Sequence, residues 1–221
     1  MPSIADYLDP LPLVAVLRGI TPGEIPAVAA ALVVEGFRML EVPLNSPQPF
    51  ESIRLLAEMH GSGCLVGAGT VLSVEDVARV GTAGGRLIVM PHGDVAIVRE
   101  AKRRELVCLP GAATPTEAFA ALAAGADGIK MFPAEALSPG VLKAWRAVLP
   151  SGTLVFPVGG IRPDTMAEYV AAGASGFGTG SNLYRPGMPA TEVRAQAARF
   201  AQGWRTARPV DSRERPRGNR R

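Results

Sequence analysis

The sequence alternates between short apolar runs and longer, alanine-rich amphipathic segments, and this alternation restricts the folds that the chain can adopt. Apolar runs bounded by glycine or proline predict buried strands, and the amphipathic segments predict helices between them. Because the unit repeats eight times, we expect a parallel sheet covered by helices. The predicted strands lie within residues 13–19, 37–44, 64–71, 86–91, 106–111, 128–133, 154–160 and 176–183. The clearest predicted helices lie within residues 24–36, 49–60, 73–84, 94–105 and 114–126.

Residues at the ends of the helical segments agree with this division of the chain. Gly36 and Gly125 come just before the next apolar run, where a left-handed residue commonly ends a helix. Thr21, Ser73 and Thr114 precede other helical segments and predict N-caps, two of them followed by proline.

A chain of 221 residues with 48% hydrophobic composition can bury a sizeable core in one domain. We predict an α/β fold, a single-domain (β/α)8 TIM barrel over residues 1–205, with a short helix at residues 4–8 across its bottom. The alternative is a doubly wound open sheet, but no GxGxxG turn follows the first predicted strand.

The positive charge is concentrated at the C-terminus. From Arg205 onward the chain has seven arginines and two acids, so residues 1–204 carry about −2 of the total charge of +3. Residues 206–221 are predicted to be a basic, disordered tail because they contain few apolar residues. The tail has no aromatic residues among its arginines, and we expect no nucleic-acid partner.

The chain has no features of an exported or membrane protein. Its N-terminus lacks the basic start and long apolar core of a signal peptide, and no apolar stretch is long enough to span a bilayer. Cys64 and Cys108 each lie in an apolar run, which predicts buried, reduced thiols. We therefore expect a cytoplasmic protein without a membrane partner.

Lys130 is the most unusual residue. It is one of only three lysines, and unlike Lys102 and Lys143, which we place on solvated helix faces, it lies within the apolar run Ile129–Phe132. An ammonium that loses hydration has a lowered pKa, and the neutral amine is the nucleophile of Schiff-base chemistry. The alternative is a lysine at a strand end whose ammonium reaches solvent.

Further candidate residues lie where the predicted strands end, the side of a barrel that carries its chemistry. Glu41, toward the end of the second strand, can shuttle protons beside Lys130, or it can simply form an ion pair with it. Arg18 can bind a carboxylate through two hydrogen bonds, or pair with Glu41. The hydroxyl of Thr70 can bind a carboxylate or carbonyl, and Pro91 and His92 follow the fourth strand, where His92 is expected to be a turn residue.

The last two predicted strands end in glycine clusters. Val158 precedes Gly159 and Gly160, and Gly180 precedes Ser181. Glycines here allow backbone N–H groups to approach an anion, which predicts a phosphate site, although glycines also form tight turns. The two histidines and the acids show no spacing of metal ligands, and we expect neither metal nor cofactor.

Several motifs together resemble a known family. They are LEVPLNSP, VGAGTVL, LIVMP, CLPGAATPTEA, GIKMFPAE, VGGIRPD and GTGSNLYRPG. From about Pro12 to Trp204 the chain resembles the short class I aldolases that cleave 2-keto-3-deoxy-6-phospho-sugar acids. The resemblance implies Lys130 as the Schiff-base lysine and Glu41 as the general acid and base. It also implies that Thr70 contacts the pyruvyl portion, that Phe132 packs beside the imine, and that Gly159, Gly160 and Ser181 bind phosphate.

Two departures place the chain nearer the galactonate-type branch of this family. Asn45 and Ser46 stand where gluconate-type enzymes usually have LEVTLRT, and Val158 stands where they have threonine. The implied partners are a phosphorylated keto-deoxy sugar acid, pyruvate and D-glyceraldehyde 3-phosphate, and the implied assembly is a homotrimer. The remaining alternatives are a gluconate-type or dual-specificity aldolase, a phosphosugar epimerase, and a non-catalytic phosphosugar-binding barrel.

Overall fold

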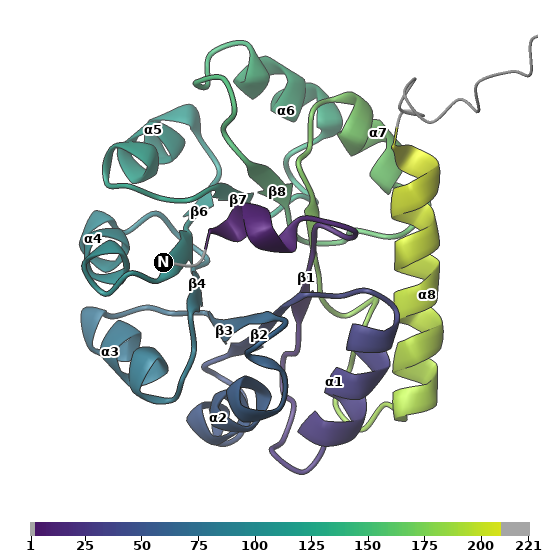
Figure 1. Ribbon diagram of the computed structural model, residues 1–221. Helices are drawn as coiled ribbons and strands as arrows, with labels where there is room; N and C mark the ends of the chain where they lie inside the picture. The colour runs from purple at the N-terminus through teal and green to yellow at the C-terminus, as the bar shows by residue number, and fades with distance from the viewer. Residues whose placement is uncertain (1–2, 209–221) are drawn as a thin grey trace, which may run out of the picture.

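A computed structural model describes residues 3–208, and in it parallel strands alternate with helices along the chain (Figure 1). The strands are β1 (Leu13–Val16), β2 (Met39–Pro43), β3 (Leu65–Gly69), β4 (Leu87–Val89), β5 (Val107–Leu109), β6 (Gly111–Ala112), β7 (Ile129–Met131), β8 (Val155–Pro157) and β9 (Phe177–Thr179). The helices are α1 (Ile25–Val34), α2 (Pro49–His60), α3 (Val74–Thr82), α4 (Val95–Arg103), α5 (Pro115–Ala123), α6 (Pro139–Arg146), α7 (Met166–Ala171) and α8 (Ala190–Ala207). Each predicted strand segment contains an observed strand.

The strands form two parallel sheets that curl around a common axis, with the helices outside (Figure 1). One sheet has the order β5-β4-β3-β2-β1-β9, and the other has the order β6-β7-β8. The predicted strand at 106–111 is divided, because Pro110 has no N–H to donate and lies between β5 and β6. At the other junction, an isolated parallel bridge pairs Val158 with Gly178. The chain therefore has an α/β fold built on a curled parallel sheet.

Side chains alternate between two apolar layers along each strand, as the two-residue period of a strand requires. Val14, Met39, Leu65 and Phe156 belong to an inner cluster enclosed by the sheet. Their strand neighbours belong to a larger outer cluster, shared with the helices. A residue's position along its strand thus decides whether its side chain faces the interior or a helix.

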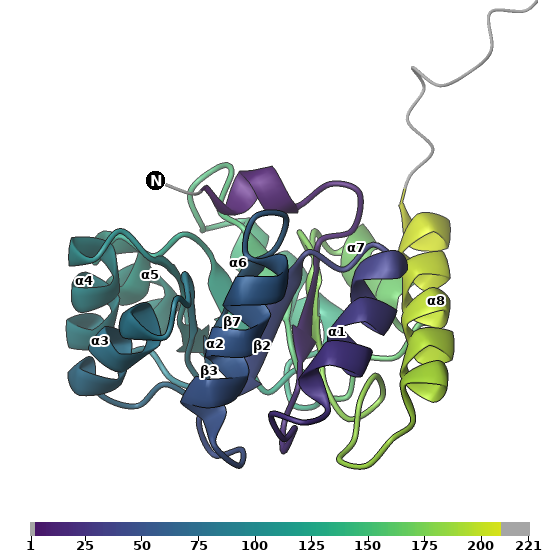
Figure 2. The same ribbon diagram turned by 60° about the horizontal axis from the view of Figure 1, so that its bottom comes forward.

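The N-terminal segment closes one end of the interior. Ile4–Tyr7 form a single turn of 3-10 helix, η1, which lies across the end of the sheet where the strands begin (Figure 2). Ile4 and Tyr7 are buried in the inner cluster, beside residues such as Met39 and Leu65 that open their strands. The predicted covering helix at 4–8 is confirmed, and the opposite end of the sheet remains for the functional site.

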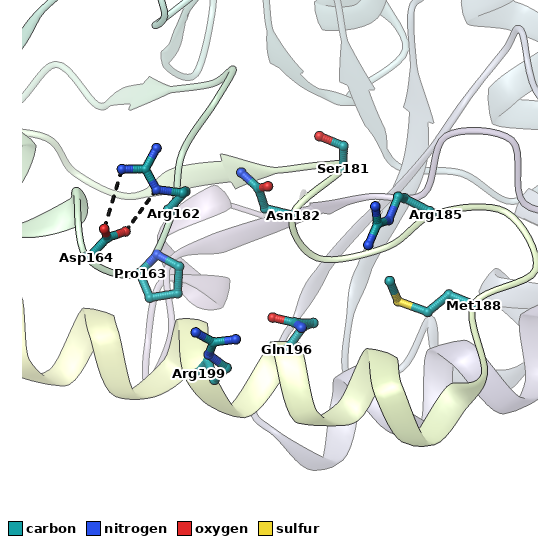
Figure 3. Close-up of a pocket in the computed structure, with 9 residues that line it drawn as sticks. All are labelled: Arg162, Pro163, Asp164, Ser181, Asn182, Arg185, Met188, Gln196 and Arg199. Carbon is teal, nitrogen blue, oxygen red and sulfur yellow. Dashed lines mark hydrogen bonds and ion pairs between the residues drawn. The ribbon is translucent and has the colours of Figure 1, made fainter.

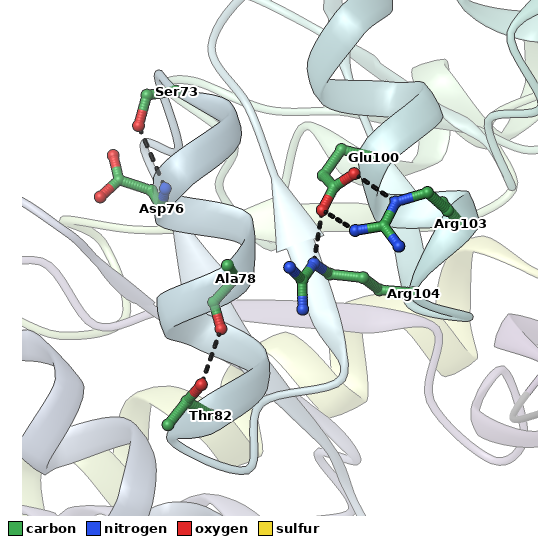
Figure 4. Close-up of polar contacts among 7 residues, drawn as sticks. All are labelled: Ser73, Asp76, Ala78, Thr82, Glu100, Arg103 and Arg104. Carbon is green, nitrogen blue, oxygen red and sulfur yellow. Dashed lines mark hydrogen bonds and ion pairs between the residues drawn. The ribbon is translucent and has the colours of Figure 1, made fainter.

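Most of the predicted helix boundaries are confirmed. Gly36 and Gly125, each with a φ of 98°, follow α1 and α5 in the left-handed conformation. The Ser73 hydroxyl accepts a hydrogen bond from Asp76 N at the start of α3 (Figure 4), and Thr114 forms a capping box at α5. The predicted N-cap at Thr21 is wrong.

The segment after Thr21 first forms a turn, and α1 begins later with Glu24 as its N-cap residue. The Glu24 carboxylate accepts hydrogen bonds from both the backbone N–H and the hydroxyl of Thr21. The Glu24 N–H, however, donates to the Thr21 carbonyl and closes a turn, so the Thr21 hydroxyl accepts no hydrogen bond from the helix.

Within residues 3–208, no helix combines the length and apolarity that crossing a bilayer requires. Cys64 and Cys108 are free and buried, as predicted.

Lys102 differs from the expectation of a solvated helix face, because its ammonium is partly buried and donates to Asp127 at 2.6 Å. The predicted tail, 206–221, lies outside the described residues from 209 onward.

Candidate active site

Lys130 and Glu41 lie on neighbouring parts of the inner surface. Lys130 occupies the middle position of β7 and is 7% exposed, and Glu41 lies on β2 and is 1% exposed. Both side chains line one small internal cavity, together with Val16, Val89, Leu109, Phe156 and other inner residues. The sheet therefore brings an amine and a carboxylate from distant parts of the sequence into a shared apolar space.

The source of the apolar surroundings differs from the sequence prediction. Ile129 and Met131, the neighbours of Lys130 in the chain, belong to the outer cluster and point toward the helices. Alternation along β7 turns them away from the ammonium. Lys130 loses hydration to inward-facing residues of other strands, which its own hexapeptide does not contain.

Burial moves the pKa values of the two groups in opposite directions. Desolvation lowers the pKa of Lys130, an effect that the Glu41 charge partly offsets and the Arg18 charge adds to. Desolvation raises the pKa of Glu41 to about 7, although the charges of Lys130 and Arg18 act in the other direction. Near neutral pH, Glu41 can therefore both release and accept a proton, and Lys130 is closer to its neutral, nucleophilic form.

The surroundings of Glu41 leave part of its carboxylate without a partner. Its Oε2 is buried and has no hydrogen-bond partner among the described residues. Gly69 provides the space, because a Cβ atom there would lie 1.8 Å from Oε2. An orphaned buried oxygen costs about 1–3 kcal/mol, and such a group commonly has a functional role. Neutralising Lys130 is therefore not a sufficient explanation of Glu41.

The guanidinium of Arg18 is held by two residues, one that follows β2 and one that follows β3. Its Nη1 donates to Asn45 Oδ1 at 2.7 Å, and its Nη2 donates to the Thr70 hydroxyl at 3.5 Å. No ion pair between Arg18 and Glu41 occurs in the described part of the chain, so this alternative is wrong. Thr70 has a φ of 54°, which directs its side chain from the strand end toward Arg18.

The predicted phosphate residues meet Lys130 in a second cavity of about 140 Å³, the mouth cavity. Gly159 and Gly160 adopt φ values of 112° and 65°, which glycine tolerates without strain. The predicted residues that line this cavity are Arg18, Lys130, Phe132, Val158, Gly159, Gly160, Gly180 and Ser181. The Lys130 ammonium lies 4.7 Å from the centre of the Phe132 ring.

Two predicted residues lie apart from this group. Pro91 follows β4 at the same end of the sheet, but it lines neither cavity and packs against Gly111. His92 follows Pro91 in a bend and is exposed. Within residues 3–208, no three His, Cys, Asp or Glu side chains gather closely enough to hold a metal ion.

The sequence prediction missed Glu135. Its carboxylate lies against the glycine pair, since a Cβ atom on Gly159 would be 2.0 Å from Glu135 Oε2. Glu135 also lines the mouth cavity, at the end predicted to bind an anion. Only the placement of the β7–α6 connection beside the end of β8 brings these residues together, so no local pattern could have revealed the contact.

A desolvated lysine and a carboxylate in one cavity enclosed by parallel strands are an arrangement that suits Schiff-base chemistry. Residues 4–195 match the family model described as "KDPG and KHG aldolase". The chain belongs to this aldolase family, as its motifs indicated.

Named relatives lie close to the chain in sequence and in structure. The chain is 49% identical, over 84% of its length and 88% of the relative, to a probable 2-dehydro-3-deoxy-6-phosphogalactonate aldolase of Rhizobium meliloti (strain 1021). It is 45% identical to the 2-dehydro-3-deoxy-6-phosphogalactonate aldolase of Escherichia coli (strain K12), over 89% of this chain and 96% of the relative. A solved structure described as native KDPGal superposes with a TM-score of 0.88 at 45% identity, covering 90% of this chain and 96% of that one.

The raised pKa of Glu41 predicts a pH-dependent stability difference between the wild type and Glu41→Gln. Below pH 4.5 the carboxyl is protonated whether the chain is folded or not, so it costs nothing. Above pH 4.5 the carboxyl ionises in the unfolded chain, but in the folded chain it stays protonated up to about pH 7. The free energy of unfolding therefore falls as the pH rises from 4.5 through about 7. At about 1.4 kcal/mol per pKa unit, the loss reaches up to ~3 kcal/mol.

Urea unfolding of both proteins between pH 5 and 8.5 measures this difference. Relative to the wild type, Glu41→Gln should gain stability as the pH rises. Loss of the Glu41 charge also lowers the pKa of Lys130 further, which acts in the same direction. The exposed carboxylate of Glu75 provides the control variant, Glu75→Gln, which should show no such trend. A Glu41→Gln difference that stays flat with pH would contradict the raised pKa.

Proposed function

We propose that the chain cleaves 2-dehydro-3-deoxy-6-phospho-D-galactonate reversibly to pyruvate and D-glyceraldehyde 3-phosphate through a Schiff base on Lys130. The observation that carries this proposal is the shared cavity of Lys130 and Glu41, with their pKa values moved toward each other. The names of the relatives support the same substrate.

Lys130 begins the reaction as the neutral amine. Its Nζ attacks the C2 carbonyl of the substrate, and loss of water from the carbinolamine forms a protonated imine. The C3–C4 bond then breaks, because its electron pair moves toward the imine nitrogen while the C4 hydroxyl loses its proton. The aldehyde leaves as D-glyceraldehyde 3-phosphate. Protonation of the remaining enamine at C3 and hydrolysis of the imine release pyruvate and restore the amine.

Glu41 is placed to move the protons of these steps. A pKa of about 7 allows it to donate a proton when the carbinolamine loses water and to accept one when the C4 hydroxyl ionises. Its unpartnered Oε2 is available for these contacts.

The two ends of the mouth cavity suit the two anionic ends of the substrate. Arg18, held by Asn45 and Thr70, presents a guanidinium to the C1 carboxylate. Gly159, Gly160 and Ser181 line the opposite end of the mouth cavity, where the phosphate of the substrate would bind. The carboxylate of Glu135 lies on the glycines and repels a phosphate, so the proposal requires its exposed side chain to rotate away on binding.

Val158 supports the galactonate epimer as the preferred substrate. It lines both cavities, between the Lys130 amine and the glycine pair, where the C4 hydroxyl of a bound substrate must pass. Its methyl groups cannot form the hydrogen bond that a threonine of nearly equal volume would offer.

We further infer that the curled sheet is a closed (β/α)8 barrel in which β5 and β6 count as one strand. The Val158–Gly178 bridge and the hydrogen bond from Ser175 N to Val155 O support closure between β8 and β9. An experimental structure in which these strands lie apart would contradict it.

The buried free thiols support a cytoplasmic location.

Trapping with borohydride tests the Schiff base directly. Pyruvate with borohydride should add one reduced adduct to the peptide that contains Lys130, located by mass spectrometry. Lys130→Met should abolish the adduct, and Lys143→Arg is the control, because Lys143 is exposed on α6. No adduct, or an adduct on Lys102 or Lys143, would reject the mechanism.

Kinetics on both C4 epimers test the substrate assignment. The wild type should prefer the galactonate epimer and retain slow cleavage of the gluconate one. Val158→Thr should move the ratio of kcat/KM values toward gluconate by about tenfold, as one hydrogen bond is worth about 0.5–1.5 kcal/mol. Val158→Ala is the control: it reduces the side-chain volume without adding a hydroxyl, so the effect of the hydroxyl in Val158→Thr can be identified. A wild type that prefers gluconate, or an unchanged ratio in Val158→Thr, would overturn the role of Val158.

A homotrimer is proposed from the family resemblance and from the exposed apolar side chains. Val34, Leu72 and Val148 are each more than half exposed, and burial in an interface would remove their apolar surface from water. Sedimentation equilibrium should give three times the chain mass of 23.0 kDa. A concentration-independent monomer or dimer would exclude the trimer.

A further inference from the structure

A separate pocket of about 510 Å³ lies beside the mouth cavity, and three arginines surround it (Figure 3). Arg162 comes from the connection between β8 and α7, Arg185 from the connection between β9 and α8, and Arg199 from α8. We call this the arginine pocket. Its lining residues are Arg162, Pro163, Asp164, Ser181, Asn182, Arg185, Met188, Gln196 and Arg199.

The charges in the arginine pocket are not balanced by the protein. Asp164 is the one acidic lining residue, and it is paired with Arg162 at 3.1 Å (Figure 3). Among residues 3–208, Arg185 and Arg199 take part in no ion pair. Three guanidiniums and one carboxylate leave a net charge of about +2, which matches a phosphate dianion. This excess is unexpected in a chain whose residues 1–204 carry about −2.

The remaining walls suit a small organic group attached to the phosphate. Pro163 and Met188 supply apolar surface, and Ser181, Asn182 and Gln196 supply neutral polar groups. Asn182 Nδ2 donates to Ile161 O at 2.9 Å, which ties together the two connections that carry Arg162 and Arg185. The pocket is thus held open by the fold, with a volume typical of small-molecule sites.

We propose that the arginine pocket is a second anion site, which binds a phosphate monoester of a small polyol separately from the substrate's own phosphate. Ser181 and Asn182 line both this pocket and the mouth cavity. An anion in the arginine pocket therefore weakens substrate binding by repelling the substrate phosphate across Ser181. The binding measurement below requires no turnover, so it fails or succeeds independently of the proposed aldol cleavage.

The test titrates the full chain with glycerol 3-phosphate in a calorimeter, at low salt. The wild type should bind two equivalents, one in each cavity. Arg185→Gln/Arg199→Gln should lose one equivalent, with affinity reduced at least tenfold, and keep the other. Arg205→Gln is the control for the loss of a surface arginine, because it removes one positive charge from an exposed position of α8 that does not line the pocket. Arg205→Gln should bind both equivalents within about twofold of the wild type.

Cleavage kinetics give the second measurement. Without added ligand, kcat/KM of Arg185→Gln/Arg199→Gln should stay within about twofold of the wild type, and inhibition by glycerol 3-phosphate should weaken. If the wild type binds only one equivalent and the double variant still binds it, the proposal is overturned. One equivalent that disappears together with a large rise in KM would also overturn it, because the arginines would then hold the substrate phosphate itself.

Discussion

The buried amine of Lys130 and the buried carboxylate of Glu41 share one largely apolar cavity inside the sheet. Removing both groups from water is costly, and the cost is lowered because each favours its neutral form. The lowered pKa of Lys130 and the pKa of about 7 for Glu41 bring the neutral pair and the ion pair closer in energy than they are in water. Glu41 can therefore exchange a proton near neutral pH. Gly69 makes the space, and the strands place both groups on the inner surface.

Much of this arrangement was predictable, because it follows from local patterns. Apolar runs placed the strands, and glycines such as Gly36 marked helix ends through a backbone conformation that other residues rarely adopt. Parallel strands that share one carboxyl edge brought Lys130, Arg18 and the glycine pair to a common cavity. Each of these inferences needs only the period of a strand and the polarity of a sheet.

Most of the errors concern contacts between segments that are distant in the sequence. The neighbours of Lys130 suggested the correct pKa direction for the wrong reason, since its desolvation comes from other strands. The position of Glu135 on the glycine pair depends on where a connection folds back. The Thr21 error is local, because Glu24 N donates to the Thr21 carbonyl in a turn and not to the Thr21 hydroxyl. Tertiary structure decided the first two cases.

The junction between β8 and β9 links the fold to the chemistry. The other neighbouring strands pair over two or more positions, whereas here one bridge joins Val158 to Gly178. Gly178 is required, because a Cβ atom there would lie 2.6 Å from Val158 Cγ2. The Val158 side chain lies over Gly178, and it also lines both cavities. Its backbone is held against β7 and the segment that follows it, by a bond from Val158 N to Met131 O and one from Ala134 N to Val158 O. The Val158 side chain takes no part in these bonds, so a substitution there can change the lining of both cavities without removing them.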